Sequence, residues 1–401
     1  MGFIELLWLL IWGGMFSGIY NLMSPRLLSN PFAFFQGARA LLPVLAGYIC
    51  CLWILAKKSR FPFLGTPPGF LFFYCMIGVI SSIFLSPDKL TAFYWAAIYL
   101  APLLVLWVGK DNVKFLVHLK RIIFTNYFIF LLITVGLLPE AFRFDRSRDV
   151  RFNTYDLPFN LGEITANGVG RFALVAVIIS FVRLFTGQKR LRFLWSVILL
   201  PSLYLLAQSQ SRTALMGLAI ASVLLVLLKG LDLRLLLVGP IAAYIIWISG
   251  VQWRSHGDIE RIMFLSGRQY TWQKGLAMIK QSPFLGWGFH ADRIMLNSEH
   301  MHNSYLHAAI HGGIIGATLF LIALFSFWVV VMRSGLIKQV RNIQGTDQAL
   351  LTESILITGF LTARSFFEST GAFYGVDLLL LLPAMTYVYL WACEHAKGDP
   401  R

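Results

Sequence analysis

The sequence contains few charged residues and few cysteines. Of its 401 residues, 13% are charged and 57% are hydrophobic, a balance that excludes a soluble domain. A glycine-rich loop of the nucleotide-phosphate type is absent as well. The four cysteines lie in or beside apolar runs, with no disulfide framework and no metal-ligand spacing: Cys50, Cys51, Cys75 and Cys393. The composition therefore predicts a membrane protein without nucleotide chemistry.

Apolar runs predict an all-α integral membrane protein with about 12 transmembrane helices. Such segments must be helical because lipid offers their backbone polar groups no partners. The first run has no basic region before it and no cleavage site after it, so we expect a retained span rather than a signal peptide. A single polytopic domain, 1–401, is expected. The predicted spans are 3–23, 40–56, 68–86, 91–109, 117–138, 166–185, 192–208, 212–228, 235–251, 303–332, 351–370 and 376–393.

Basic residues predict the orientation of these spans. Lys and Arg concentrate in the short loops after even-numbered spans, which places those loops and both termini in the cytoplasm. Nine of the twelve lysines then lie on the cytoplasmic side, whereas thirteen of the twenty-two arginines face outward. About half of the outward arginines fit ordinary solvent or headgroup contacts. Because arginine binds phosphate through a bidentate fork, the others predict an anionic substrate on the periplasmic side, and nucleic acid is not expected.

A periplasmic loop, 252–302, is predicted between the ninth and tenth spans. Its central part, from Arg268 to Gln281, has the pattern of an amphipathic helix that lies on the membrane face. Three apolar residues fall at helical spacing there: Trp272, Leu276 and Ile279. We expect a cavity under this loop, with the stretch 268–281 as a movable lid and the Ser282-Pro283 break and Gly286-Trp287-Gly288 as its hinge.

The most informative motif is His302-Asn303, followed by Gly313 and Gly316 in a long apolar segment. One interpretation is structural, with Asn303 as a helix cap and the glycines allowing close helix packing. That interpretation does not account for a titratable histidine at the edge of a bilayer, where such a group indicates a functional site. We therefore predict that His302 belongs to an active site.

Other polar residues near the predicted membrane surface have two interpretations each. Arg212 lies in a short polar hairpin, as a snorkelling side chain or as a phosphate ligand in a cavity. Arg364 and Glu368, four residues apart on the eleventh span, are expected to form a structural ion pair, with substrate contact as the alternative. Four histidines suggest a metal, but no carboxylate stands at ligand spacing, so no metal is predicted. They are His300, His302, His307 and His311.

Together these features resemble the O-antigen ligase and polymerase superfamily of bacterial envelope enzymes. The resemblance covers most of the chain. It is carried by the spans, the large loop, the hairpin at Arg212, 266–268 with Trp272 downstream, 283–288 and the His302-Asn303-x9-Gly313-x-x-Gly316 motif. It implies an O-antigen ligase of the inner membrane that moves O-polysaccharide from undecaprenyl diphosphate to lipid A–core. It implies inversion at the sugar without metal, nucleotide or other cofactor.

The resemblance also implies roles for single residues. His302 would be the general base, with Arg212 and Arg268 on the diphosphate, although Arg261 fits a looser family pattern and leaves the choice of loop arginine open. The remaining expected substrate-binding residues are Asn303, Arg261, Arg171, Arg146, Arg148, Trp272 and Arg364.

The motif alone leaves other functions open. An O-antigen polymerase or a protein O-oligosaccharyltransferase shares it, although protein-glycosylating members are typically longer, which favours a ligase. A flippase for lipid-linked sugars is the alternative of another class, but internal repeats, which are typical of such carriers, are not evident.

Overall fold

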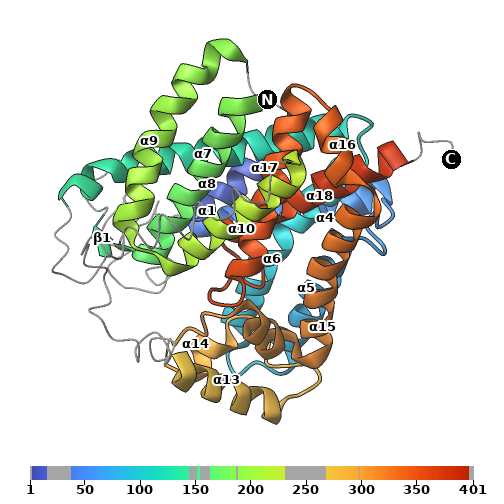
Figure 1. The fold of residues 1–401 in the computed structure, drawn as a ribbon. Coiled ribbons are helices and arrows are strands. Elements are labelled where there is room, and N and C mark those ends of the chain that lie inside the picture. Colours follow the sequence, from blue (N-terminus) through green and yellow to red (C-terminus); the bar gives the residue numbers. More distant parts are fainter. Residues whose placement is uncertain are drawn as a thin grey trace. The chain divides into compact units, whose positions relative to one another are not determined.

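The computed structural model describes residues 2–15, 38–143, 151–153, 163–186, 188–230, 268–297 and 299–396, and this part of the chain is almost entirely helical (Figure 1). Its one sheet pairs β1 (Arg151–Asn153) with β2 (Glu163–Thr165) in antiparallel fashion. Nine of the described helices are long and apolar enough to cross a membrane. The predicted all-α membrane class is confirmed.

The predicted spans coincide with helices wherever the chain is described, with two differences. The first helix, α1, covers only Phe3–Met15 of the predicted span 3–23, and residues 16–37 lie outside the described part. The eleventh predicted span, 351–370, is wrong at its end, because helix α17 runs from Thr346 to Arg364. The ninth predicted span, 235–251, lies outside the described residues.

The chain divides into two compact units, and the first contains residues 1–123, 270–328 and 368–389. Within it, α6 packs against α4 and α5, and α1 packs against α4 and α6. Its helices are α1, η2 (Arg39–Leu41), α4 (Leu42–Lys57), α5 (Pro67–Phe84), α6 (Lys89–Lys110), α14 (Ala291–Met295) and most of α13 (Arg268–Gln281), α15 (Ser304–Arg333) and α18 (Val376–Ala396). The start of α7 (Phe115–Arg143) also belongs to it.

The second unit contains residues 124–269, 329–367 and 390–401. It holds most of α7, both strands, α8 (Ala166–Thr186), η3 (Lys189–Leu191), α9 (Arg192–Ser209), α10 (Arg212–Lys229), α16 (Leu336–Asn342) and α17. Helix α8 packs against α9, α10 and α17. An ion pair between partly buried Arg183 and buried Glu353 joins α8 to α17, with Arg183 Nε and the Glu353 carboxylate 2.7 Å apart. The Arg183 guanidinium also lies over the rings of Phe124 and Trp195. The positive charge of Arg183 is therefore compensated by Glu353 and by these rings among the apolar helices.

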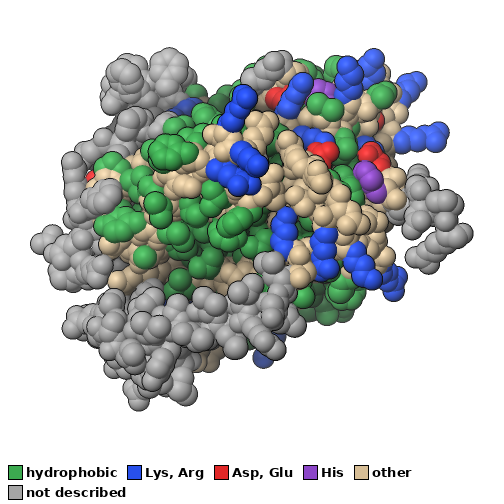
Figure 2. All heavy atoms as spheres, turned by 45° about the horizontal axis from the view of Figure 1, so that its top comes forward, with side chains coloured by type: hydrophobic (Ala, Val, Ile, Leu, Met, Phe, Trp, Pro, Cys, Tyr) green, Lys and Arg blue, Asp and Glu red, His purple; other side chains and the backbone are tan. Residues whose placement is uncertain are grey.

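Exposed apolar side chains indicate where helices face lipid. On α9, Phe193, Val197 and Leu200 are exposed and follow one another at helical spacing. Figure 2 shows wide areas of hydrophobic side chains on one face of the molecule, beside groups of Lys and Arg. Exposed apolar surface on this scale is unfavourable in water and favourable against acyl chains.

Helix α15 is interrupted at Gly312 and Gly313, within its third turn. Gly313 adopts φ 61° and ψ −159°, a conformation that is essentially restricted to glycine. The segment 283–288 pairs with this interruption: Trp287 N–H donates to Ile310 O at 2.7 Å, and Ile314 N–H donates to Pro283 O at 2.7 Å. The polar groups released by the break are thus satisfied inside the protein, as membrane depth requires. These bonds attach the segment 283–288, which contains the predicted hinge, to α15. The lid itself stays a prediction.

We predict that Gly313→Ala destabilises the protein far more than Gly316→Ala. A Cβ at Gly313 would lie 2.2 Å from the carbonyl carbon and oxygen of Phe284, whereas at Gly316 the nearest atom would be 3.3 Å away. The backbone conformation alone costs about 1–3 kcal/mol. The measurement is the melting temperature of the purified protein in detergent. Gly335→Ala is the control, since Gly335 has φ 67° and no neighbour within 4 Å of an added Cβ. Equal shifts for Gly313→Ala and Gly335→Ala would contradict the role given to the docked segment.

Candidate active site

His302 lies in the short segment that enters α15, and Asn303 caps that helix. The Asn303 Oδ1 accepts hydrogen bonds from the backbone N–H groups of Tyr305 and Leu306, at 2.9 and 3.0 Å. The structural interpretation of Asn303 is therefore confirmed, and its role in substrate binding stays a prediction. His302 itself adopts φ 47°, which is uncommon for a residue with a side chain and is concentrated at functional sites.

The His302 side chain is 43% exposed and is paired with Glu368. Its Nδ1 lies 3.1 Å from Glu368 Oε2. An ionised carboxylate only accepts hydrogen bonds, so the pairing assigns the proton of neutral His302 to Nδ1 and leaves the lone pair on Nε2. A carboxylate that orients an imidazole in this way is the arrangement of a histidine general base.

Glu368 is placed by a non-helical segment, 365–375, that follows α17. Ser304 at the start of α15 donates to the carbonyls of Glu368 and Thr370, at 2.8 and 2.9 Å. Tyr74 of α5 donates to Ala372 O, and Tyr99 of α6 donates to Gly371 O, both at 2.7 Å. The expected helical i, i+4 spacing of Arg364 and Glu368 is wrong, because α17 ends at Arg364, and their ion pair stays a prediction. Glu368 pairs with His302.

Next to His302 lies a group of imidazoles, of which His290, His307 and His311 are buried and His300 is partly buried. The His302 N–H donates to His300 Nδ1 at 3.0 Å, and the His300 ring is 4.8 Å from the His307 ring. Burial lowers the pKa of His300 well below its usual value, which favours a neutral ring. His290 stacks on Trp95 at 4.4 Å, and burial lowers its pKa to about 3. Burial therefore favours the neutral form of both His290 and His300.

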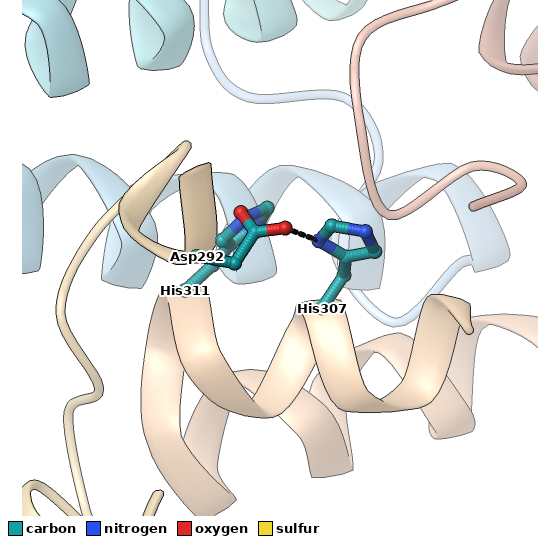
Figure 3. A group of neighbouring side chains, drawn as sticks. All are labelled: Asp292, His307 and His311. Atoms are coloured by element: carbon teal, nitrogen blue, oxygen red, sulfur yellow. Dashed lines mark ion pairs between the residues drawn. The ribbon is translucent and has the colours of Figure 1, made fainter. Parts of the chain in front are cut away.

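Asp292 is the carboxylate that the sequence analysis did not associate with these histidines. Its Oδ2 lies 3.5 Å from His307 Nδ1, and His311 stands one helical turn further along α15 (Figure 3). Burial raises the pKa of Asp292 to about 6, while the neighbouring Arg293 guanidinium acts in the opposite direction. Asp292 and His307 are 15 residues apart in the sequence, so their contact cannot be read from a local pattern. It depends on how 283–292 folds back on α15.

A separate polar group surrounds Arg364 in the second unit. Arg364, 3% exposed, donates to Thr213 Oγ1 at 3.2 Å and to Asn167 O at 3.4 Å. Ser211 caps α10 and donates to Asn167 Oδ1 at 3.0 Å. Arg212, beside Thr213, is exposed. The exposed guanidinium of Arg212, in the hairpin between α9 and α10, and the buried guanidinium of Arg364, at the end of α17, thus both belong to segments that meet at a group of hydroxyl and amide side chains.

The other predicted site residues have separate positions. Arg171, one turn along α8 from Asn167, lies over the Phe172 ring at 4.8 Å. Arg268 begins α13 and donates to Phe367 O. Trp272 Nε1 donates a hydrogen bond to Met301 O at 2.8 Å, which is a structural role. Its contact with substrate stays a prediction. Arg146, Arg148 and Arg261 lie outside the described residues.

The predicted convergence of His302 with Arg212 or Arg268 stays a prediction, because His302 belongs to the first unit and both arginines to the second. The predicted helix of the loop is confirmed as α13, but its face differs from the expectation. Gly275 and Met278 are buried, whereas Leu276 is exposed. Glu368 and Asp292 are the residues that the sequence analysis missed as neighbours of the histidines.

Two comparisons with known proteins bear on this site. A family model described as O-antigen ligase matches residues 197–321, a range that includes Arg212, Arg268 and His302. The exopolysaccharide production protein ExoQ of Rhizobium meliloti (strain 1021) is 27% identical over 238 residues, which is 50% of this chain and 52% of the relative. The match therefore spans about half the length of that relative.

Proposed function

We propose that this chain, which is similar to proteins of the O-antigen ligase/polymerase superfamily, transfers a glycan from undecaprenyl diphosphate to a hydroxyl of lipid A–core at the periplasmic face of the inner membrane. The observation that carries the proposal is the pairing of half-exposed His302 with Glu368 at the start of a membrane-spanning helix. This pairing supports a general base at the depth where a lipid-linked sugar meets water.

His302 acts as the base in this reaction. Its Nε2 accepts the proton of the acceptor hydroxyl while that oxygen forms a bond to the anomeric carbon. The bond between this carbon and the diphosphate oxygen breaks, and the electron pair leaves with the diphosphate, so the sugar configuration inverts. Glu368 is a positioning residue, since it holds His302 in the tautomer with Nε2 unprotonated and stabilises the imidazolium that forms.

Arginines stabilise the leaving diphosphate. Arg212 and Arg268 are the proposed ligands, and Arg364 and Arg171 extend the positive charge around Asn167. A guanidinium fork matches two phosphate oxygens at once and stabilises the charge that develops as the bond breaks. The donor is already activated by its diphosphate, so the transfer needs neither a nucleotide nor a metal at the reacting atoms.

The acceptor has a second candidate. The name of the relative refers to exopolysaccharide production, which supports a growing glycan chain as acceptor and hence a polymerase. Both reactions use the same base and the same leaving group. They differ only in which hydroxyl enters the site.

We predict that His302→Ala lowers transfer by roughly 10²–10⁴-fold, the usual contribution of a general base, while the protein still folds. Glu368→Gln should cause a smaller loss, because the amide keeps a hydrogen bond but not the charge. The measurement is single-turnover transfer from lipid-linked glycan by purified protein. Glu299→Gln is the matched control, since Glu299 forms an exposed ion pair with Lys274. Wild-type rates for His302→Ala would remove the proposed base.

We also predict that Arg212→Lys and Arg268→Lys each lower turnover, since an ammonium group keeps the charge but lacks the bidentate fork. The same transfer assay measures the effect, with folding checked by melting temperature. Arg190→Lys is the control, because Arg190 is exposed in the short 3-10 helix η3. Unchanged turnover in both test variants would show that Arg212 and Arg268 act only through their charge and do not bind the diphosphate in a bidentate manner.

The acceptor is tested by the lipopolysaccharide gel profile of cells that lack the protein. For a ligase, the whole ladder disappears, the core remains intact, and lipid-linked polymer accumulates. A single-repeat rung on the core would instead identify a polymerase. Loss of outward-facing donor would identify a flippase and overturn the proposed transfer.

A further inference from the structure

Three potential metal ligands lie together beneath His302, in the first unit. Asp292, His307 and His311 are 1%, 0% and 0% exposed, and each offers one ligand atom, with these atoms within 4.8 Å of one another (Figure 3). His307 and His311 stand four residues apart on one face of α15, the spacing by which a helix presents two imidazoles to one ion. Asp292 comes from the N-terminal turn of α14.

Hydrogen bonds set the tautomer of His311. The hydroxyl of Tyr74 has one proton and donates it to Ala372 O at 2.7 Å, so the 3.0 Å contact between Tyr74 and His311 Nδ1 requires the imidazole to donate. The lone pair of His311 is therefore on Nε2, which among the described residues accepts one long hydrogen bond, from the His290 backbone N–H at 3.4 Å. A neutral imidazole whose other nitrogen is held by a hydrogen bond is the usual form of a metal ligand.

His307 has no comparable explanation as a structural residue. Neither of its ring nitrogens makes a hydrogen bond with the described residues, and neither does Asp292 Oδ2. Burying such groups without partners costs free energy, and most proteins satisfy them with water or an ion. A direct Asp292–His307 pair does not suffice, because their 3.5 Å separation exceeds a charge-assisted hydrogen bond and leaves His307 Nε2 unused.

We infer that Asp292, His307 and His311 bind one divalent transition-metal ion of the zinc class. Two imidazoles and one carboxylate suit Zn²⁺, whereas Mg²⁺ and Ca²⁺ prefer oxygen ligands. The carboxylate offsets part of the ion's charge beside Arg293.

The ion would have a structural role. Its ligands are buried, so it would not reach substrate, and it would fasten α14 to the first turns of α15. The ion would not take part in the proposed transfer, whose reacting atoms need no metal. Its test measures metal and stability rather than activity.

The experiment uses the full-length protein purified in detergent without chelator. Mass spectrometry of the metals should find about one zinc per chain. After removal of the metal, added Zn²⁺ should raise the melting temperature by a few degrees. Asp292→Asn and His307→Gln should lose both the bound zinc and this rise in melting temperature. The two variants remove different ligands, so one still tests the site if the other fails to fold.

Two controls separate this site from other histidines. His395→Gln, near the end of α18, and His302→Ala should both retain the zinc and the rise in melting temperature. If His302→Ala lost the Zn²⁺-dependent rise in melting temperature, the ion would be bound by the exposed imidazole of His302, and the inference would be overturned. A wild-type protein without zinc and without a Zn²⁺-dependent shift would overturn it as well, whatever the transfer assay shows.

Discussion

The site depends on one constraint, which is that backbone polar groups at membrane depth need partners within the protein. Helix α15 breaks at Gly312 and Gly313, and the segment 283–288 supplies the missing hydrogen bonds from outside the helix. Because the segment is held there, the chain that follows it, with His290 and Asp292, lies against the first turns of α15. A continuous helix would satisfy its own backbone and offer this segment no place to bind.

The same constraint explains how Glu368 reaches His302. Residues 365–375 are not helical, and three hydroxyl groups from three different helices satisfy carbonyls in this segment: Tyr74, Tyr99 and Ser304. Each of these is a hydrogen bond of modest net strength, but leaving the buried carbonyls without partners would be costly. Hydroxyl side chains on apolar helices therefore have a specific task here, namely to hold an irregular segment that carries a functional carboxylate.

Much of the fold could be predicted from the sequence, because a helix that crosses a membrane is a local pattern of apolar residues. The spans from 40–56 to 212–228 coincide with helices, and the cap at Asn303 follows from residue type and position. The contacts of the site are not local. A spacing of four residues predicts that Arg364 and Glu368 lie one turn apart on a helix, and this rule fails where α17 ends. Asp292 was not connected with His307, because nothing in the spacing shows that 283–288 docks on α15.

The exposed histidine, His302, and the buried histidine, His307, have different structural requirements although they lie five residues apart. A general base must reach substrate, and His302 keeps 43% of its side chain exposed at the cost of a left-handed backbone conformation. Such a residue holds its geometry only when its surroundings determine it, and catalysis tolerates deviations of only about 0.5 Å. The surroundings here are His300, which accepts the His302 N–H, and His307, whose ring packs against His300. An ion bound by His307 would therefore fix the position of the base two contacts away, without touching the substrate.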